Sequence, residues 1–142
     1  MFGFRLFTVL AYDAASKRLV RLRSNRPDIN PVGGVKRVTQ SRWVDQVLRR
    51  GEIFIGSTRE DVKAVFSDYA LLWSIGCASA LNIPVRKSGV TIGTLNLLGD
   101  AGQYDGAEAG LALTFAQLVV APIEASSHRL RDLPTDGDLE HV

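Results

Sequence analysis

The sequence predicts a single α+β domain, in which helices pack on a central antiparallel β-sheet. Three observations support this prediction. The chain has 142 residues, which is about the length of one domain. Hydrophobic residues make up 46% of it and charged residues 23%, as in ordinary globular proteins. The periodic segments follow the order β β α β α β β α. The domain is expected to cover residues 1–131, and residues 132–142 are expected to form a disordered acidic tail.

The first two strands are expected to form a hairpin. In residues 4–12 the even-numbered positions, among them Leu6 and Leu10, share one face, and the odd-numbered positions, among them Val9, share the other. This alternation is the pattern of a β-strand. Residues 17–24 form the return strand, with its apolar side chains directed inward. Its charged side chains are expected to point outward; they are Lys17, Arg21 and Arg23.

A loop, a short helix and a short strand follow. Residues 25–34 contain two prolines and two glycines, which favour a loop. Residues 42–50 have apolar pairs at i,i+4 spacing, and Asp45 can meet Arg49 one turn later, so they predict a helix. Residues 53–56 are too few for a helix and are expected to form a strand.

A second helix is expected over residues 57–76. The run Ser57-Thr-Arg-Glu60 matches a capping box, which begins a helix, and Gly76 ends the helical pattern. Asp68 lies inside this apolar pattern. It is expected either to cap a break in the helix or to hold a ligand amine.

The next two strands, residues 79–86 and 91–98, carry the most information about a site. A three-residue loop between them places Asn82 opposite Asn96 on one face. The other face is then aliphatic, with the pairs Leu81–Leu97, Ile83–Leu95 and Val85–Gly93. We expect this aliphatic face to receive the C-terminal helix, with Gly93 allowing a close approach.

The polar face of the same strands predicts a ligand cavity. Each unpaired amide inside a core would cost about 1–3 kcal/mol. The two asparagines therefore either bond to each other and to nearby loops, or form the floor of a cavity. The expected cavity is bounded on the sheet by Ala80, Asn82, Thr94 and Asn96, and above it by Trp43, Asp68, Tyr69 and Trp73. The aromatic residues also fit an ordinary helix core.

The last helix is expected over residues 105–130, capped by Asp105 and interrupted near Pro122. It is apolar on more than one stripe, and one stripe is enough to cover the sheet. The exposed remainder predicts a homodimer through this helix, unless an end of the chain folds back over it. One stripe consists of Leu111, Phe115 and Leu118; the other apolar positions are Ala112, Leu113, Ala116, Val119, Val120 and Ile123.

Charge and cysteine content exclude several classes of function. Residues 1–50 carry a net charge of +8 and residues 51–142 a net charge of −6, which fits two solvated faces better than a nucleic-acid interface. The apolar stretches fall short of the ~18 residues that a membrane span needs. Cys77 is the only cysteine, so no internal disulfide and no CxxC metal site can form, and a cytoplasmic location is expected.

The central strands and their surroundings resemble a GAF domain of the small, single-domain bacterial kind. The resemblance covers about residues 4–125. It rests on the order of several short motifs: Pro31-Val-Gly-Gly34, Trp43, Phe66-Ser-Asp68, Ile75-Gly76, Ala80-Leu-Asn-Ile-Pro-Val85, Gly89, Val90-Thr-Ile-Gly-Thr-Leu-Asn-Leu-Leu98 and Tyr104-Asp105. It implies a PAS-like fold, with a central antiparallel sheet, the end helices on one face and a small-molecule pocket on the other.

The resemblance also implies three functions between which the sequence does not decide. The first is a stand-alone sensory or regulatory module that binds a small molecule, whose identity, like that of any cofactor, is unknown. The second is a free methionine-R-sulfoxide reductase, which needs resolving cysteines that this chain lacks. The third is a structural dimerisation module without a ligand. No metal site and no catalytic residue are expected.

Overall fold

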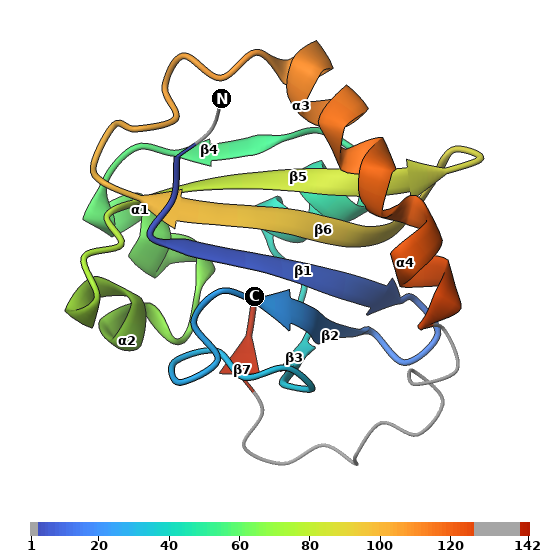
Figure 1. Ribbon diagram of the computed structural model, residues 1–142, viewed down its shortest axis with the longest axis horizontal. Helices are drawn as coiled ribbons and strands as arrows, with labels where there is room; N and C mark the ends of the chain where they lie inside the picture. Colours follow the sequence, from blue (N-terminus) through green and yellow to red (C-terminus); the bar gives the residue numbers. More distant parts are fainter. Residues whose placement is uncertain (1–2, 127–139) are drawn as a thin grey trace.

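The computed structural model describes residues 3–126 and 140–142. Within these residues, seven strands form one sheet in the order β4-β5-β6-β1-β2-β3-β7 (Figure 1). Neighbouring strands are antiparallel, apart from β7, which pairs in parallel with β3. The predicted α+β class with a central antiparallel sheet is therefore confirmed. The strands are β1 (Leu6–Asp13), β2 (Arg18–Ser24), β3 (Val35–Arg37), β4 (Phe54–Gly56), β5 (Ser79–Lys87), β6 (Val90–Gly99) and β7 (Glu140–His141).

Helices cover both faces of this sheet. The helices α3, η2 and α4 lie in front of it in Figure 1, and η1, α1 and α2 pack on the opposite face. No helix in the described part of the chain is long and apolar enough to cross a membrane. The helical segments are η1 (Val44–Arg49), α1 (Arg59–Val65), α2 (Tyr69–Ser74), α3 (Ala109–Ala116), η2 (Gln117–Val119) and α4 (Val120–Ala125).

The two faces have the assignment that the strand alternation predicts. The aliphatic face packs against Ala112, Ala116 and Ile123 of the terminal helices; its core residues on β5 and β6 are Leu81, Ile83, Val85, Leu95 and Leu97. A Cβ atom at Gly93 would lie 2.7 Å from Ile123 Cδ1 and 2.3 Å from the Leu10 carbonyl oxygen, so this strand position accepts no side chain. Close approach of α4 to the sheet thus depends on a glycine.

The β5–β6 hairpin keeps the predicted register but reaches it by a different turn. Asn82 pairs with Asn96 and Val85 with Gly93, as expected. The turn has two residues, Ser88 (φ 53°) and Gly89 (φ 77°), and the positive φ angles are typical of a type I′ turn. A register shift between Val85 and Arg86 compensates for the shorter loop.

The helices predicted over residues 57–76 and 105–130 begin at other residues in the structure, and the first of them is divided in two. The capping box is Thr58 with Asp61, one residue later than predicted, because Thr58 has the extended backbone of an N-cap. The predicted 57–76 helix breaks at residues 66–68 into α1 and α2. Glu108 caps α3 by accepting from the Gly110 and Leu111 amides, while Asp105 accepts a hydrogen bond from Ser57 Oγ instead.

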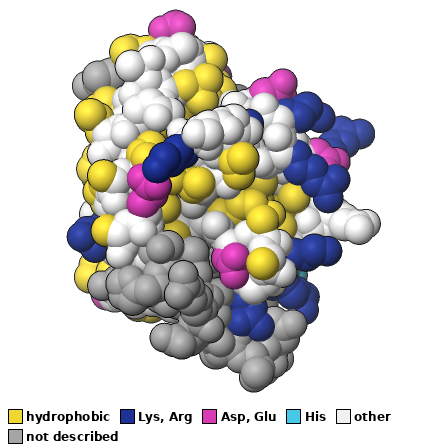
Figure 2. Space-filling model, turned by 90° about the vertical axis from the view of Figure 1, so that its right-hand side faces the viewer, with side chains coloured by type: hydrophobic (Ala, Val, Ile, Leu, Met, Phe, Trp, Pro, Cys, Tyr) yellow, Lys and Arg dark blue, Asp and Glu magenta, His cyan; other side chains and the backbone are white. Residues whose placement is uncertain are grey.

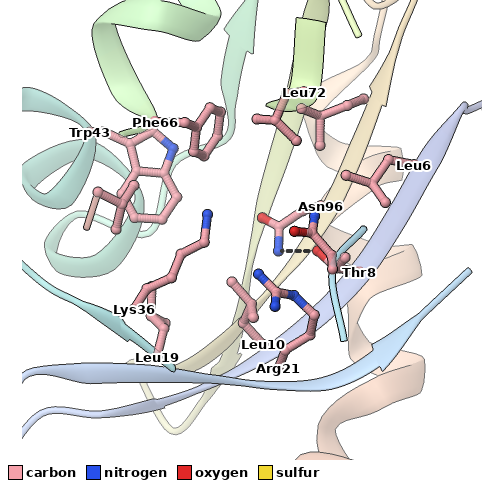
Figure 3. A pocket seen from close by; sticks show the side chains of 13 residues that line it. Leu6, Thr8, Leu10, Leu19, Arg21, Lys36, Trp43, Phe66, Leu72 and Asn96 are labelled. Carbon is pink, nitrogen blue, oxygen red and sulfur yellow. Dashed lines mark hydrogen bonds between the residues drawn. The ribbon is translucent and has the colours of Figure 1, made fainter. Parts of the chain in front are cut away.

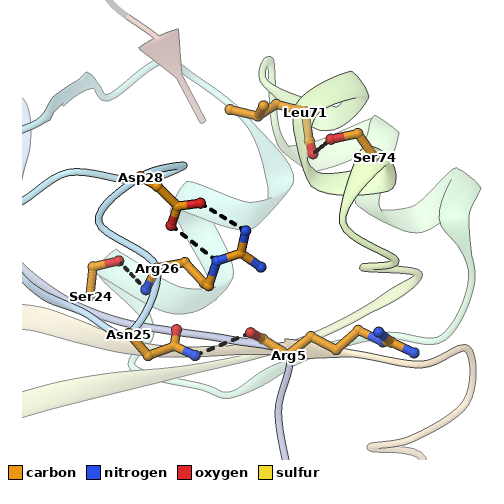
Figure 4. A network of polar contacts seen from close by, with 7 residues as sticks. All are labelled: Arg5, Ser24, Asn25, Arg26, Asp28, Leu71 and Ser74. Carbon is orange, nitrogen blue, oxygen red and sulfur yellow. Dashed lines mark hydrogen bonds and ion pairs between the residues drawn. The ribbon is translucent and has the colours of Figure 1, made fainter.

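The loop over residues 25–34 is ordered by polar contacts with the start of β1 (Figure 4). The Asn25 side chain accepts from the Phe7 amide at 2.6 Å and donates to the Arg5 carbonyl oxygen at 3.1 Å, so it extends the pairing of β1. Arg26 forms two hydrogen bonds to the Asp28 carboxylate, 2.8 and 3.0 Å long. This loop brings Asn30 against the polar face of the sheet.

The end of the chain also differs from the prediction. Of the tail expected over residues 132–142, residues 132–139 lie outside the described part. Glu140 and His141 form β7 on the edge of β3, and Val142 is buried at 3% exposure. The last turn of the predicted terminal helix, after residue 126, is likewise outside the described residues.

Candidate functional site

A small cavity lies on the polar face of the sheet (Figure 3). Its volume is about 20 Å³, room for about one water molecule. Its apolar walls come from both the sheet and the covering helices, and its polar groups come mainly from the sheet. The lining residues that the argument uses are Thr8, Arg21, Lys36, Trp43, Phe66, Asn96 and Val142.

The predicted asparagine pair is the centre of a hydrogen-bonded network. Asn82 Nδ2 donates to Asn96 Oδ1 at 2.8 Å, and Trp43 Nε1 donates to Asn82 Oδ1 at 2.9 Å. Asn96 Nδ2 in turn donates to the hydroxyl oxygens of Thr8 and Thr94. The side chain of Asn82 is fully buried and has both of its polar atoms satisfied within the protein. The network therefore fixes Trp43 on the sheet.

A buried ion pair lies beside the network. Lys36 Nζ is 3.5 Å from Asp68 Oδ1, and the two side chains are only 7% and 4% exposed. The same ammonium group lies over the Phe66 ring, 5.0 Å from its centroid. Neither Asp68 oxygen has a hydrogen-bond partner within the described part of the chain. Because each charge would be costly to bury alone, the ion pair couples strand β3 to the α1–α2 connection.

Lys36 and Arg21 are the charged residues among the cavity residues that the sequence prediction missed. Arg21 was expected to point outward, but it is 4% exposed, and its Nη1 donates to the Pro31 carbonyl oxygen at 3.1 Å. In Figure 3 its guanidinium rises from β2 toward Asn96, and Lys36 rises from β3 toward Trp43 and Phe66. The prediction failed because it assumed that one face of the hairpin is solvated, whereas helices cover both faces. The alternation of Arg21 with the buried Leu22 and Val20 carried no warning of this.

Only some of the other predicted site residues line the cavity. Asn96 lines the cavity, while Thr94 and Ala80 are fully buried on the same strands without lining it. Tyr69 and Trp73 pack edge to face, 4.9 Å between centroids, on the outer side of the core. Trp73 Nε1 donates to the Arg59 carbonyl oxygen, so both aromatics brace α2 against α1.

A wider groove lies on the other side of Trp43. It has a volume of about 400 Å³ and runs between η1, β4 and α1. Trp43 lines both this groove and the cavity; the other residues of the groove include Arg42, Phe54, Asp61 and Val65. Trp43 therefore lies between the wider groove and the small polar cavity.

Cys77 is placed away from this cavity. It is fully buried in the apolar core on the same face, and this burial raises the pKa of its thiol to about 11. The thiol is thus protonated at neutral pH, a state in which it is a poor nucleophile. No group of three or more His, Cys, Asp or Glu side chains within residues 3–126 and 140–142 is arranged to hold a metal ion.

Comparison with known proteins finds similar solved structures but no match to a protein-family model or to a curated protein sequence. Among solved structures, the GAF domain of a two-component sensor histidine kinase from Bacillus halodurans is 17% identical, with a TM-score of 0.63; the match covers 92% of this chain and 88% of that chain. The GAF domain from Acinetobacter phosphoenolpyruvate-protein phosphotransferase is 14% identical, with a TM-score of 0.63, and 91% and 75% are covered.

An enzyme is found among the similar structures as well. The type II free methionine-R-sulfoxide reductase from Thermoplasma acidophilum is 10% identical, with a TM-score of 0.63, and the match covers 86% of this chain and 80% of that chain. At these identities the likeness concerns the fold alone. The similar structures include signalling domains and reductases, so fold similarity does not choose between them.

Proposed function

We propose that this chain, which has a GAF-like fold, is a sensory or regulatory module that binds a small molecule on the polar face of its sheet. One observation carries the proposal: the polar face holds a buried ion pair and a buried amide network around a cavity, while the opposite face is aliphatic. A core built only for stability gains nothing from burying charges. Buried polar groups on apolar walls are typical of a ligand site.

The site proposed is the cavity at Asn96, Lys36 and Trp43 together with the adjoining groove. The cavity admits about one water molecule, so a ligand requires a movement of one of its walls. Asp68, Thr94 and Asn82 support this site from behind, through the ion pair and the amide network.

Native mass spectrometry of the purified protein tests this proposal. We expect a noncovalent small-molecule adduct that disappears under denaturing conditions and is weakened in a Lys36→Met variant. The matched control is Lys63→Met, because Lys63 is exposed on α1 and lies over Tyr69 outside the cavity. An unliganded mass for the wild-type protein, maintained through a panel of metabolites, would contradict ligand binding.

The reductase alternative has less support. Reduction by a cysteine pathway needs a reactive thiolate, and Cys77 is buried and protonated at neutral pH. We expect no thiol-dependent reduction of free methionine-R-sulfoxide by the wild-type protein. Turnover that is lost in Cys77→Ser would establish the enzyme instead. A free, buried cysteine is also what the proposed cytoplasmic location predicts.

We further propose that the module is a homodimer through α3 and η2. In α3 the residues that face the sheet, Ala112 and Ala116, are small, while large side chains of α3 and η2 face outward: Leu111 is 44%, Phe115 39% and Leu118 72% exposed. Figure 2 shows hydrophobic side chains along the edge of the molecule on which these helices lie. A self-complementary apolar stripe favours a twofold pairing.

Sedimentation of a Leu118→Glu variant tests the dimer. We expect the wild type to sediment as a dimer and Leu118→Glu as a monomer with unchanged thermal stability. Val119 is a poorer position for this test because it packs partly into the core, so a charge there would also disturb the fold. Leu71→Glu on α2 is the control, since Leu71 is 38% exposed on the other face of the sheet. A concentration-independent monomer mass for the wild type would refute the dimer.

A further inference from the structure

Strand β7 is held by two different parts of the molecule. On one side the Val142 amide donates to the Arg37 carbonyl oxygen, and the Val142 carbonyl oxygen accepts from the Thr39 amide and hydroxyl at 3.2 and 2.8 Å. On the other side His141 and Ser67 exchange two hydrogen bonds, one through the serine hydroxyl. The segment therefore bridges β3 and the connection between α1 and α2.

The last residue of this segment fills space in the cavity. Val142 is 3% exposed and lines the cavity together with Lys36 and Phe66. Only about 20 Å³ is left beside these side chains. Any ligand larger than about one water molecule must therefore displace one wall.

Among the strands around the cavity, β7 has the shortest pairing. Strands β1 and β6 are long and paired on both sides, whereas β7 pairs over two residues at the edge of the sheet. Local opening is easiest in short edge elements with few contacts. Ser67, which β7 contacts, lies between Phe66 and Asp68, and both of these pack against Lys36. Release of β7 would thus loosen the ion pair and the aromatic wall together.

We propose that the segment Glu140–Val142 and a ligand compete for this cavity, so that ligand binding releases β7 from β3. This inference rests on the proposed function and adds its regulation: the docked segment is the unliganded state, and the released segment is the signal. Coupling of this kind is reciprocal, so whatever holds β7 in place weakens ligand binding by the same factor.

Hydrogen exchange of a Val142→Gly variant tests the docking. We expect the amides of Thr39 and Ser67, which donate to β7, to exchange about tenfold faster than in the wild type, a change within the usual range for coupled sites. The amide of Ile83 in the core is expected to keep its wild-type rate. Val90→Gly is the matched control, because Val90 is 60% exposed next to the β5–β6 turn. Unchanged rates at Thr39 and Ser67, or an equal acceleration at Ile83, would overturn the proposal.

Competition is tested with the probe 8-anilinonaphthalene-1-sulfonate, which has apolar rings for the cavity walls and a sulfonate for its cationic side chains. We expect Val142→Gly to bind this probe about tenfold more tightly than wild type or Val90→Gly, and the probe to accelerate exchange at Thr39 and Ser67 in the wild type. Equal affinity for all three proteins, or binding that leaves both amides protected, would overturn competition.

The two proposals fail in different ways. If the probe and exchange results are as expected but native mass spectrometry finds no natural small molecule on the wild type or on Val142→Gly, competition stands and the proposed function fails. If a natural small molecule binds the wild type while the Thr39 and Ser67 amides keep their protection, the proposed function stands and competition is overturned.

Discussion

The two faces of the sheet are buried to a similar extent but are stabilised differently. Beneath α3 and α4, the contacts are between aliphatic side chains that need no particular partner. Beneath η1, α1 and α2, the sheet carries the Lys36–Asp68 pair and the Asn82–Asn96 network, whose groups depend on one another. Truncation of a side chain on the first face lowers the free energy of unfolding by the value of its lost packing contacts. On the second face, truncation also leaves a buried polar partner without a hydrogen bond or counter-charge. The face on which buried polar groups depend on one another is therefore the face on which a bound ligand could replace one of these partners.

The largest expected effect is that of Asp68→Ala. This change leaves the Lys36 ammonium buried without its counter-charge, which costs about 3–5 kcal/mol of unfolding free energy. Urea unfolding followed by circular dichroism measures the loss. The control is Asp45→Ala, which removes an exposed i,i+4 pair with Arg49 and should cost about 0.3–0.5 kcal/mol. Similar losses in the two variants would mean that the polar face has no special partner dependence.

Gly93→Ala tests the aliphatic face. The new Cβ would meet the Leu10 carbonyl oxygen at 2.3 Å, so β1 or α4 must shift. We expect a loss of about 3 kcal/mol, the upper end for overpacking. Gly106→Ala is the control, because a Cβ at Gly106 has open space around it. A loss in Gly93→Ala no larger than that in the control would show that α4 is not closely packed on the sheet.

Trp43→Phe tests the amide network with a smaller effect. It removes the indole donor and leaves Asn82 Oδ1 buried without a partner, which is expected to cost about 1–2 kcal/mol. Trp73→Phe makes the same chemical change at a half-buried position, where water can replace the lost donor to the Arg59 carbonyl oxygen. Equal unfolding free energies for the two variants would contradict a structural role for the network.

A pH dependence that comes from Cys77 has no effect at neutral pH and is expected only in alkaline solution. Burial raises the thiol pKa to about 11, above its usual value, so the folded state binds this proton more tightly than the unfolded state. The associated stability is complete below about pH 8.5 and is lost as the pH rises further, with a slope of at most about 1.4 kcal/mol per pH unit. Unfolding curves between pH 8 and about 10.5 should therefore fall more steeply for wild type than for Cys77→Ser. Parallel curves would contradict burial of the thiol.

Sequence periodicity predicted five of the seven described strands and the identity of the two faces of the central strands, whereas β3 and β7 were not predicted. Alternation in β5 and β6 placed Asn82 and Asn96 opposite each other and Leu81 beneath the terminal helices, because side-chain direction in a strand has a strict period of two. It was not sufficient for Arg21 and Lys36. A basic side chain in a hairpin is ordinarily solvated, and its burial depends on helices from distant parts of the chain.

The candidate site was predictable only in part for the same reason. Trp43 and Asn96 meet at the cavity as expected, since both follow from strand and helix patterns. The participation of Val142 had no local signal, because a two-residue pairing at a sheet edge is set by long-range contacts. A break in the helix at Asp68 was one of two alternatives that the sequence left open, because residues 62–73 keep helical spacing through it. Asp68 lies at this break, in the N-cap position of α2, but its side chain makes no capping hydrogen bond.

The β5–β6 turn has a consequence for how the hairpin tolerates changes in length. The two-residue turn and the register shift change the strand alignment in opposite directions, and both lie on the turn side of the Asn82–Asn96 pair. Residues added between Ser88 and Gly89 would lengthen the protruding tip, while the shift at Val85 and Arg86 continues to set the alignment of everything beyond it. The tip of this hairpin is therefore a natural place to splice a reporter peptide into the chain, far in the fold from the β7 edge (Figure 1).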